Sequence, residues 1–244
     1  MPVQHSLEGV SFRWIQPSTK LPLWSLRPVQ RCLPFIQWPM EILNTRFTGG
    51  QWDPRRLHAL RKLSRMPKMS TVAIGAFVNL LVQSLPRDQA YLNIGVWYGY
   101  SLLAGMLGNT AKRCIGVDTF RYFGGPRRQF FRRFHRYRSP RHAFFDMDWR
   151  QYFAHVHRGP IGLLYYDAEH DYESQYQALN SAAPFLAPGA YILVDDTNED
   201  GPRRALADFL MAHPEYELLY DIFTAGNCHP TYWNCLMVAR KRFL

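Results

Sequence analysis

The sequence predicts a doubly wound α/β fold, in which a mostly parallel sheet of seven strands carries helices on both faces and ends in an antiparallel hairpin. Three observations indicate this fold. Short apolar runs alternate with segments of helical periodicity from residue 90 onward, which is typical of a buried parallel sheet. Glycine or acidic residues follow one apolar run after another. A turn-forming stretch joins the last two apolar runs and predicts the hairpin.

The first fifty residues differ in composition from the rest of the chain. They are rich in proline and tryptophan and show no sustained period of 2 or 3.6 residues. The prolines would interrupt any long helix. We therefore expect residues 1–50 to form an irregular arm, packed through Trp14, Trp24, Phe35 and Trp38 on a domain that spans residues 51–244.

Helix caps, hydrophobic periodicity and helix-breaking residues predict the helices and strands of this domain. Asp53-Pro54 predicts a helix start, an N-cap followed by proline in the first turn, and a second helix runs from about residue 70 to Pro86. Pro188-Gly189 is expected to end the helix that begins at 172. Strands are expected at 90–95, 113–118, 142–147, 161–166, 191–194, 217–223 and 232–239, and the intervening helices at 101–107, in part of 121–141, at 172–186 and at 202–212.

A glycine turn follows the first of these strands. Gly95 and Gly99 stand four residues apart, and such a turn lets a ligand approach the main chain at a helix N-terminus. Asp118 ends the next strand, where an acid can accept both ribose hydroxyls of a nucleoside. The alternative is a plain strand-to-helix turn and a solvated or capping carboxylate.

Three further acids end two neighbouring strands. Asp167 follows one strand, and Asp195 and Asp196 follow the next, so we expect their carboxylates to converge. Unpaired carboxylates repel and raise each other's pKa, and Mg²⁺ relieves that repulsion. His170 would then accept a proton from a substrate hydroxyl. The alternative is that one acid caps a helix and another pairs with an arginine.

The net charge of +10 is concentrated in one segment. Eight arginines and no acid lie between Arg121 and Arg141, which predicts attraction to an anionic substrate, nucleic acid or surface. The alternative is a solvated helix face. The segment also interleaves aromatic residues that would stack on RNA bases, namely Phe130, Phe131, Phe134 and Tyr137.

The segment from Met69 to Arg240 resembles class I S-adenosylmethionine-dependent methyltransferases, and most closely the macrocin-type sugar O-methyltransferases. The resemblance rests on LNIGVWYGYS, GVDTF, YDAEHDYE and LAPGAYILVDD. It implies a Rossmann-like fold in which Asp118 holds the ribose, and Asp148 and Trp149 lie by the adenine. It implies that the methionine end lies near Gly95, Gly99 and Ser101, with Asn93 and Asp167 also contacting the cofactor. Asn93 stands where the family has an acid. The family's Mg²⁺ ligands correspond to Asp167, Asp195 and Asp196, and its base to His170.

The resulting hypothesis is methyl transfer from S-adenosylmethionine to a hydroxyl of a small molecule, such as a sugar or anionic glycoside, assisted by Mg²⁺. A metal-independent methyltransferase is one alternative, and an RNA-binding protein with a vestigial cofactor pocket is another, although nucleic acid is not the favoured partner. A homo-oligomer is left open. No apolar run has transmembrane length. Four cysteines without a C-x-x-C pair predict free thiols and a cytoplasmic protein.

Overall fold

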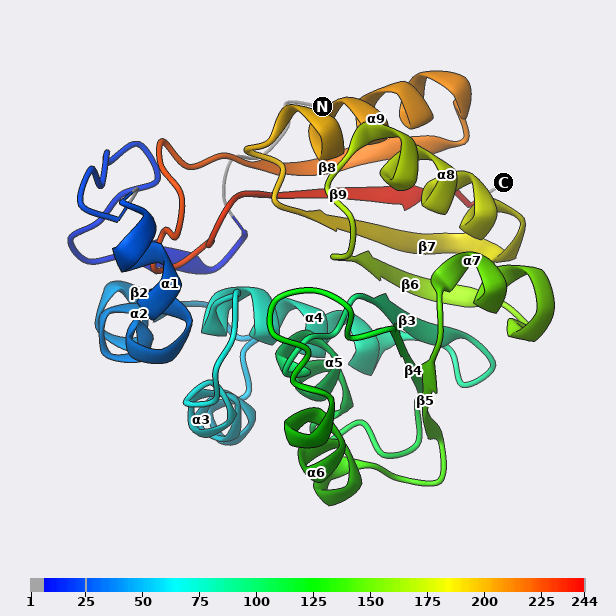
Figure 1. Cartoon of the computed structure of the whole chain (residues 1–244), viewed down its shortest axis with the longest axis horizontal. Helices are drawn as coiled ribbons and strands as arrows, with labels where there is room; N and C mark the ends of the chain where they lie inside the picture. The colour runs from blue at the N-terminus through cyan, green and yellow to red at the C-terminus, as the bar shows by residue number, and fades with distance from the viewer. Residues whose placement is uncertain (1–6, 25, 244) are drawn as a thin grey trace.

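Seven strands form the central sheet of the computed structural model, which describes residues 7–24 and 26–243 (Figure 1). Their spatial order is β5-β4-β3-β6-β7-β9-β8. The strands β3 to β7 are parallel, and β9 runs antiparallel to both β7 and β8. The predicted fold class and C-terminal hairpin are confirmed. The strands are β3 (Ala90–Ile94), β4 (Arg113–Asp118), β5 (His142–Asp146), β6 (Ile161–Tyr166), β7 (Leu186–Asp195), β8 (Tyr216–Ile222) and β9 (Leu236–Lys241).

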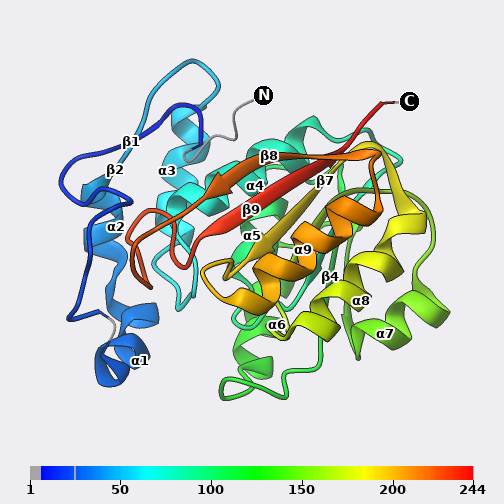
Figure 2. The ribbon, with the colours of Figure 1, turned by 90° about the horizontal axis from the view of Figure 1, so that it is seen from above.

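Helices cover both faces of this sheet (Figure 2). The strands alternate their side chains between two apolar clusters, one against each helical layer. The predicted N-cap Asp53 accepts a hydrogen bond from the N–H of Arg55 and begins α3 (Pro54–Leu63). One layer contains α4 (Val72–Ser84), α5 (Tyr100–Met106) and α6 (Arg127–Tyr137). The other contains α7 (Trp149–Gln151), a π-helical turn (Tyr152–Val156), α8 (Tyr172–Ala182) and α9 (Asp200–Ala212).

The segment before residue 50 is more regular than expected. It contains α1 (Arg27–Ile36), α2 (Trp38–Asn44) and a small antiparallel pair of strands, β1 (Val10–Phe12) and β2 (Thr45–Phe47). Pro28 and Pro39 lie in the first turn of their helices, where no backbone N–H is needed. Phe35 packs edge-to-face on Tyr98, and Trp24 and Trp38 also contact the domain as predicted, whereas Trp14 is 61% exposed. The first six residues of the expected arm lie outside the described residues.

A buried ion pair attaches this segment to the rest of the domain. The Glu41 carboxylate on α2 lies 2.8 Å from the Lys68 ammonium and also accepts the N–H of Val72 at the start of α4. Burial, opposed by Lys68, raises the pKa of Glu41 to about 7. Separating the two charges would leave each of them buried without a partner, which costs on the order of 3–5 kcal/mol of stability. The pair therefore fixes α2 against the start of α4.

The boundary between α8 and β7 was predicted wrongly. The helix ends at Ala182, a short 3₁₀ turn (Ala183–Phe185) follows, and β7 already begins at Leu186. Pro188-Gly189 lies inside this strand, where the register with β6 shifts. A bulge accommodates a residue without an N–H and a glycine at positive φ, so these breakers mark a strand irregularity.

The last strand also begins later than predicted. Residues 229–235 form a tight turn with a single bridge between His229 and Trp233, and three residues from 228 to 235 have positive φ. This backbone cannot continue a ladder, so β9 starts at Leu236. No helix of the described residues has both the length and the apolar character needed to cross a bilayer.

Candidate functional site

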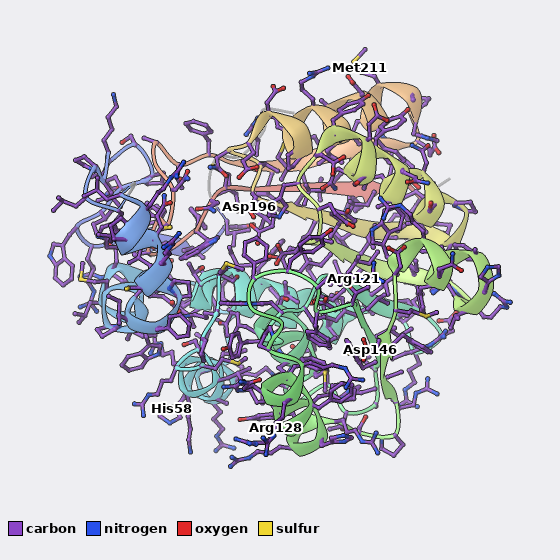
Figure 3. The ribbon with its side chains drawn as sticks, in the orientation of Figure 1. His58, Arg121, Arg128, Asp146, Asp196 and Met211 are labelled. Atoms are coloured by element: carbon purple, nitrogen blue, oxygen red, sulfur yellow. The ribbon has the colours of Figure 1, made fainter. Side chains whose placement is uncertain are left out.

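A cavity of about 610 Å³ lies beyond the carboxyl ends of the parallel strands. Its floor comes from the ends of β3, β4, β6 and β7. Its walls come from α1, the loop after β4 and the loop before β9. Figure 3 shows Asp196 near the centre of the molecule, between the sheet and the N-terminal segment. The volume is in the range of cavities that hold small-molecule ligands.

The predicted glycine turn reaches this cavity at Gly95. A Cβ at Gly95 would lie 1.8 Å from the carbonyl oxygen of Asp167, so the glycine is required by the close approach of two strand ends. The carboxylate of Asp118 accepts the N–H groups of Val96 and Trp97 on Oδ2 at 2.8 and 2.9 Å, and that of Phe120 on Oδ1. Asp118 therefore holds the turn together and also lines the cavity.

Three other residues predicted to contact the cofactor lie behind the turn. Asn93 is fully buried, and Ser101 donates a hydrogen bond of 2.7 Å from Oγ to Asn93 Oδ1. Asn93 also donates to the carbonyl of Gly95. A Cβ at Gly99 would meet the ring of Phe130. None of the three lines the cavity, so the structure gives them a role in shaping the turn.

Asp148 and Trp149, predicted to lie by the adenine, both line the cavity, and a third residue joins them. Asp148 caps α7 by accepting the N–H of Arg150. The indole of Trp149 donates a hydrogen bond of 2.9 Å to Glu169 Oε2, which also accepts the hydroxyl of Tyr166 at 3.1 Å. Glu169 lines the cavity but was not predicted as a site residue. Glu169 stands four residues before Glu173 in an acidic stretch, and nothing in this sequence pattern predicts that it accepts the indole N–H.

An acidic cluster occupies another part of the same cavity. His170 Nε2 lies 3.8 Å from Asp167 Oδ1 and 3.1 Å from Asp196 Oδ2. One ligand atom of each residue lies within 4.8 Å of the others, so the three are suitably placed for a metal ion. Asp167 follows β6, His170 lies in the loop between β6 and α8, and Asp196 follows β7 with a φ of 52°.

The charges within this cluster shift its pKa values. Burial raises the pKa of Asp167 to about 6, with the charge of Asp196 adding to the effect and His170 opposing it. Burial also raises the pKa of Asp196, again opposed by His170. For His170, burial favours the neutral ring, but the two carboxylates outweigh it and raise its pKa to about 9. The imidazole and carboxylates stabilise each other as an ion pair.

Asp195, predicted as a metal ligand, points away from the cluster. Its Oδ2 accepts a hydrogen bond of 2.6 Å from the hydroxyl of Tyr165, and its Oδ1 accepts the N–H of Asp196. Side chains alternate along β7, so Asp195 lies on the face of Leu193 and Tyr165. Burial and the neighbouring carboxylates raise its pKa well above the usual range. Asp195 does not line the cavity.

The donor atoms of the cluster fit a divalent cation. Among the described residues, Asp196 Oδ1 is buried without a hydrogen-bond partner, and His170 Nε2 is held only by its ion pairs with the carboxylates of the cluster. Buried polar atoms rarely lack partners, and a free carboxylate oxygen beside two further ligand atoms is suited to a bound cation. The group that fits is therefore Asp167, His170 and Asp196.

The arginines of the arginine-rich segment do not contribute to the cavity. Residues 127–137 of the segment form α6, and none of its eight arginines lines the cavity, although Tyr122 and Phe123 near its start do. Figure 3 shows Arg128 at the outer edge of the molecule. Phe130 and Phe134 are buried against the sheet, so they are core residues and cannot stack on RNA bases. The alternation of arginine and phenylalanine reflects an amphipathic helix.

The N-terminal helix α1 forms a wall that the sequence did not reveal. Residues one helical turn apart line the cavity, among them Arg27, Arg31 and Phe35. The aromatic residues Trp97, Tyr122, Phe123 and Trp233 line it as well. The spacing of 27, 31 and 35 is a helical signal, but the prolines around it obscured the helix.

Comparisons with known proteins identify the central domain. Residues 92–197 match the family model described as a methyltransferase domain. No curated protein matches the chain by sequence. Cofactor-bound Rv0187 from MTB superposes with a TM-score of 0.60 and 21% identity, over 79% of this chain and 92% of that chain.

Two similar structures are described as O-methyltransferases. The O-methyltransferase from Bacillus cereus in complex with SAH gives a TM-score of 0.57 and 16% identity, over 78% of this chain and 92% of that chain. A putative O-methyltransferase from Klebsiella pneumoniae gives 0.57 and 17%, over 78% and 91%. Residues 92–197 are thus a methyltransferase domain, and the chain has the class I S-adenosylmethionine-dependent methyltransferase fold.

Proposed function

We propose that the protein transfers a methyl group from S-adenosylmethionine to a hydroxyl oxygen of a small molecule, assisted by a divalent cation such as Mg²⁺. The observation that carries the proposal is that one cavity of a methyltransferase domain contains both the Asp118 turn and the Asp167–His170–Asp196 cluster. Such a cavity brings donor and acceptor together, and alignment of the two is the protein's main contribution to the rate.

The residues around Asp118 suit a nucleoside. Its carboxylate lines the cavity, and the one acceptor position that its three bound N–H groups leave free can accept a ribose hydroxyl. Ile94, Val117, Met147 and Trp149 line the same cavity and offer an apolar surface for adenine. S-adenosylmethionine would supply the methyl group as a sulfonium. The bound SAH of the similar Bacillus cereus enzyme supports this cofactor.

The acidic cluster would hold the cation through Asp167 and Asp196. A cation bound there supplies Lewis acidity that lowers the pKa of the acceptor hydroxyl. We propose that His170, which lines the same cavity, receives the proton of that hydroxyl, since a cation on Asp167 and Asp196 would offset the two carboxylates that raise the pKa of its ring. Asp195, hydrogen-bonded to Tyr165, would support the end of β7 rather than bind the cation.

A metal-independent methyltransferase is the second candidate, and one observation favours it. The His170 ring lies between two carboxylates, and its pKa of about 9 favours the protonated form at neutral pH. An imidazolium would then neutralise the carboxylates that the cation neutralises in the first proposal. The two candidates differ in whether the cluster binds a cation.

The walls of the cavity favour an anionic acceptor. Arg27 and Arg31 of α1 line it and make no ion pair with a carboxylate of the described residues. The rings of Phe35, Phe123 and Trp233 would pack against the apolar face of a sugar. A sugar or anionic glycoside fits both features. The eight arginines of the segment 121–141, by contrast, do not line the cavity.

Titration of Mn²⁺, followed by electron paramagnetic resonance, tests the metal proposal. The wild-type protein should bind one ion, and Asp196→Asn should weaken binding by at least about tenfold. Asp195→Asn is the matched control, because that carboxylate faces Tyr165, and it should change the affinity by less than about threefold. No ion bound to the wild type, or equal losses in both variants, would favour the metal-independent candidate.

Calorimetry with S-adenosylmethionine tests the reaction class. Micromolar affinity supports the methyltransferase, and a methyl-sized mass gain on a member of a panel of sugars and anionic glycosides would identify the acceptor class. Absence of cofactor binding together with salt-sensitive RNA binding would support the RNA-binding alternative instead. The four free thiols agree with the cytoplasmic location that we propose.

A further inference from the structure

Exposed apolar side chains are concentrated in the N-terminal segment. Of the twelve large hydrophobic residues that are strongly exposed among the described residues, seven lie between positions 14 and 43. Ile36 is 61% exposed at the end of α1, and Met40 and Leu43 lie one turn apart on α2. We call the seven residues the N-terminal apolar surface: Trp14, Leu23, Leu26, Phe35, Ile36, Met40 and Leu43. Clustering of this kind is unusual for a surface that faces only water.

The charged residues around this surface are almost all cationic. Five exposed basic residues belong to the same segment: Arg13, Lys20, Arg27, Arg31 and Arg46. Glu41 is the one acidic residue in the sequence between positions 9 and 52, and it is fully buried and paired with Lys68. None of the five cations makes an ion pair with a carboxylate in the described part of the chain. The segment therefore presents apolar and cationic side chains, with Glu8 as its one exposed acid among the described residues before position 50.

The N-terminal apolar surface adjoins the mouth of the cavity. Both views show α1 and α2 together on one flank of the molecule (Figures 1 and 2). Phe35 belongs to this surface and also lines the cavity. The loop after β4 adds Tyr122 and Phe123, which are 64% and 65% exposed and line the cavity too. Exposed apolar residues from both segments thus take part in lining the cavity.

We propose that the N-terminal apolar surface docks on a phospholipid bilayer that contains anionic lipid. Apolar side chains flanked by cations are the pattern of helices that lie in the interface of such a bilayer. A second copy of the chain, related by a twofold axis, would bring the same cations against each other. RNA would match the cations but would leave Ile36, Met40 and Leu43 in water. The bilayer matches both features, and it places the cavity entrance next to the membrane.

Sedimentation with sucrose-loaded vesicles tests this docking surface. The full chain should partition onto vesicles of 70% phosphatidylcholine and 30% phosphatidylglycerol, and at least about tenfold more weakly onto pure phosphatidylcholine. Ile36→Asp/Leu43→Asp should reduce binding to the anionic vesicles by at least about tenfold. Met211→Asp is the matched control, since Met211 is 81% exposed on α9 at another edge of the molecule, and it should bind like the wild type (Figure 3).

A second pair of variants tests whether vesicle binding depends on the cations of this surface or on any exposed cation. Lys20→Gln/Arg13→Gln should weaken binding, whereas Arg128→Gln/Arg132→Gln on α6 should leave it nearly unchanged. The proposal is overturned if the wild type does not bind anionic vesicles, or if the α6 variant loses binding while Ile36→Asp/Leu43→Asp retains it. It is also overturned if light scattering shows a dimer that Ile36→Asp/Leu43→Asp converts to a monomer while vesicle binding is absent. All these readouts are independent of methyl transfer.

Discussion

Replacing Gly95 by alanine measures how closely the ends of β3 and β6 approach. Gly95 has a φ of +78°, and an added Cβ would lie 1.8 Å from the carbonyl oxygen of Asp167. That oxygen would have to recede by about 1.6 Å to reach an ordinary contact distance. Gly124 is a matched control, because its φ is +80° and a Cβ there would have nothing within 4 Å. Both variants place alanine at a positive φ, and only Gly95→Ala also brings a Cβ against the carbonyl oxygen of Asp167.

The expected stability losses follow from these two terms. A non-glycine residue in the left-handed region costs about 1–2 kcal/mol, which is the whole effect expected for Gly124→Ala. Gly95→Ala adds displacement of a buried strand end, for a total of about 4 kcal/mol. In a chain of this size each kcal/mol lowers Tm by about 2–4 °C. Gly95→Ala should therefore lower Tm by about 8–16 °C, and Gly124→Ala by at most half of that.

Differential scanning calorimetry measures both losses, and Mn²⁺ titration adds a functional readout. Movement of Asp167 would change its distance of 3.8 Å to His170, so Gly95→Ala should also weaken Mn²⁺ binding. Gly124→Ala should leave that affinity unchanged. Equal Tm losses in the two variants would refute the close approach of the two strand ends. They would also refute the conclusion that this contact requires a glycine at position 95.

Two further predictions concern His229 and Glu169. The pKa of His229 is lowered to about 4 by burial, and its Nδ1 accepts the N–H groups of Thr231 and Tyr232. The unfolded state binds a proton below about pH 6.5 and the folded state does not, so the free energy of unfolding should fall by about 3 kcal/mol from pH 6.5 to 4. His229→Asn keeps an acceptor and should lack this fall in chemical denaturation, whereas parallel pH curves would contradict the assignment. Glu169→Ala removes the acceptor of the Trp149 indole and should weaken SAH binding about five- to tenfold in calorimetry, whereas unchanged affinity would contradict its positioning role.

Residues that follow strands were predicted well because the sheet itself places them. Asp118, Asp167 and Asp196 all line the cavity, as expected for the carboxyl ends of neighbouring parallel strands. This inference needs only the element order and the apolar runs. It does not depend on the conformation of any loop, so local sequence patterns were sufficient.

The order of strands and helices could not predict in which direction the side chain of Asp195 points at the end of its strand. Asp195 and Asp196 are adjacent, and the sequence cannot show which of them is the last residue of the ladder. The structure ends β7 at Asp195, which keeps the alternation of the strand and faces Tyr165. Asp196 follows with a φ of 52°, and this turn directs its carboxylate to the cavity. A one-residue difference in strand length decides which of the two carboxylates lines the cavity.

The N-terminal segment escaped prediction for a different physical reason. Its prolines are individually unfavourable inside a helix, and together they indicated irregular backbone. Pro28 and Pro39 occupy first turns, where that penalty vanishes, whereas Pro34 lies inside α1; the Glu41–Lys68 pair fixes α2 through a residue outside the segment. Tertiary packing thus determines these helices more than local propensity does.

The two halves of the cavity differ in origin, and this difference bears on function. Asp118, Trp149 and the acidic cluster belong to the methyltransferase domain at 92–197, where fold geometry places them. Arg27, Arg31 and Phe35 come from a segment outside that domain match. If the first set holds the cofactor and the second meets the acceptor, then acceptor choice is determined by α1. The same helix borders the N-terminal apolar surface, so membrane docking and acceptor entry would be coupled through one element.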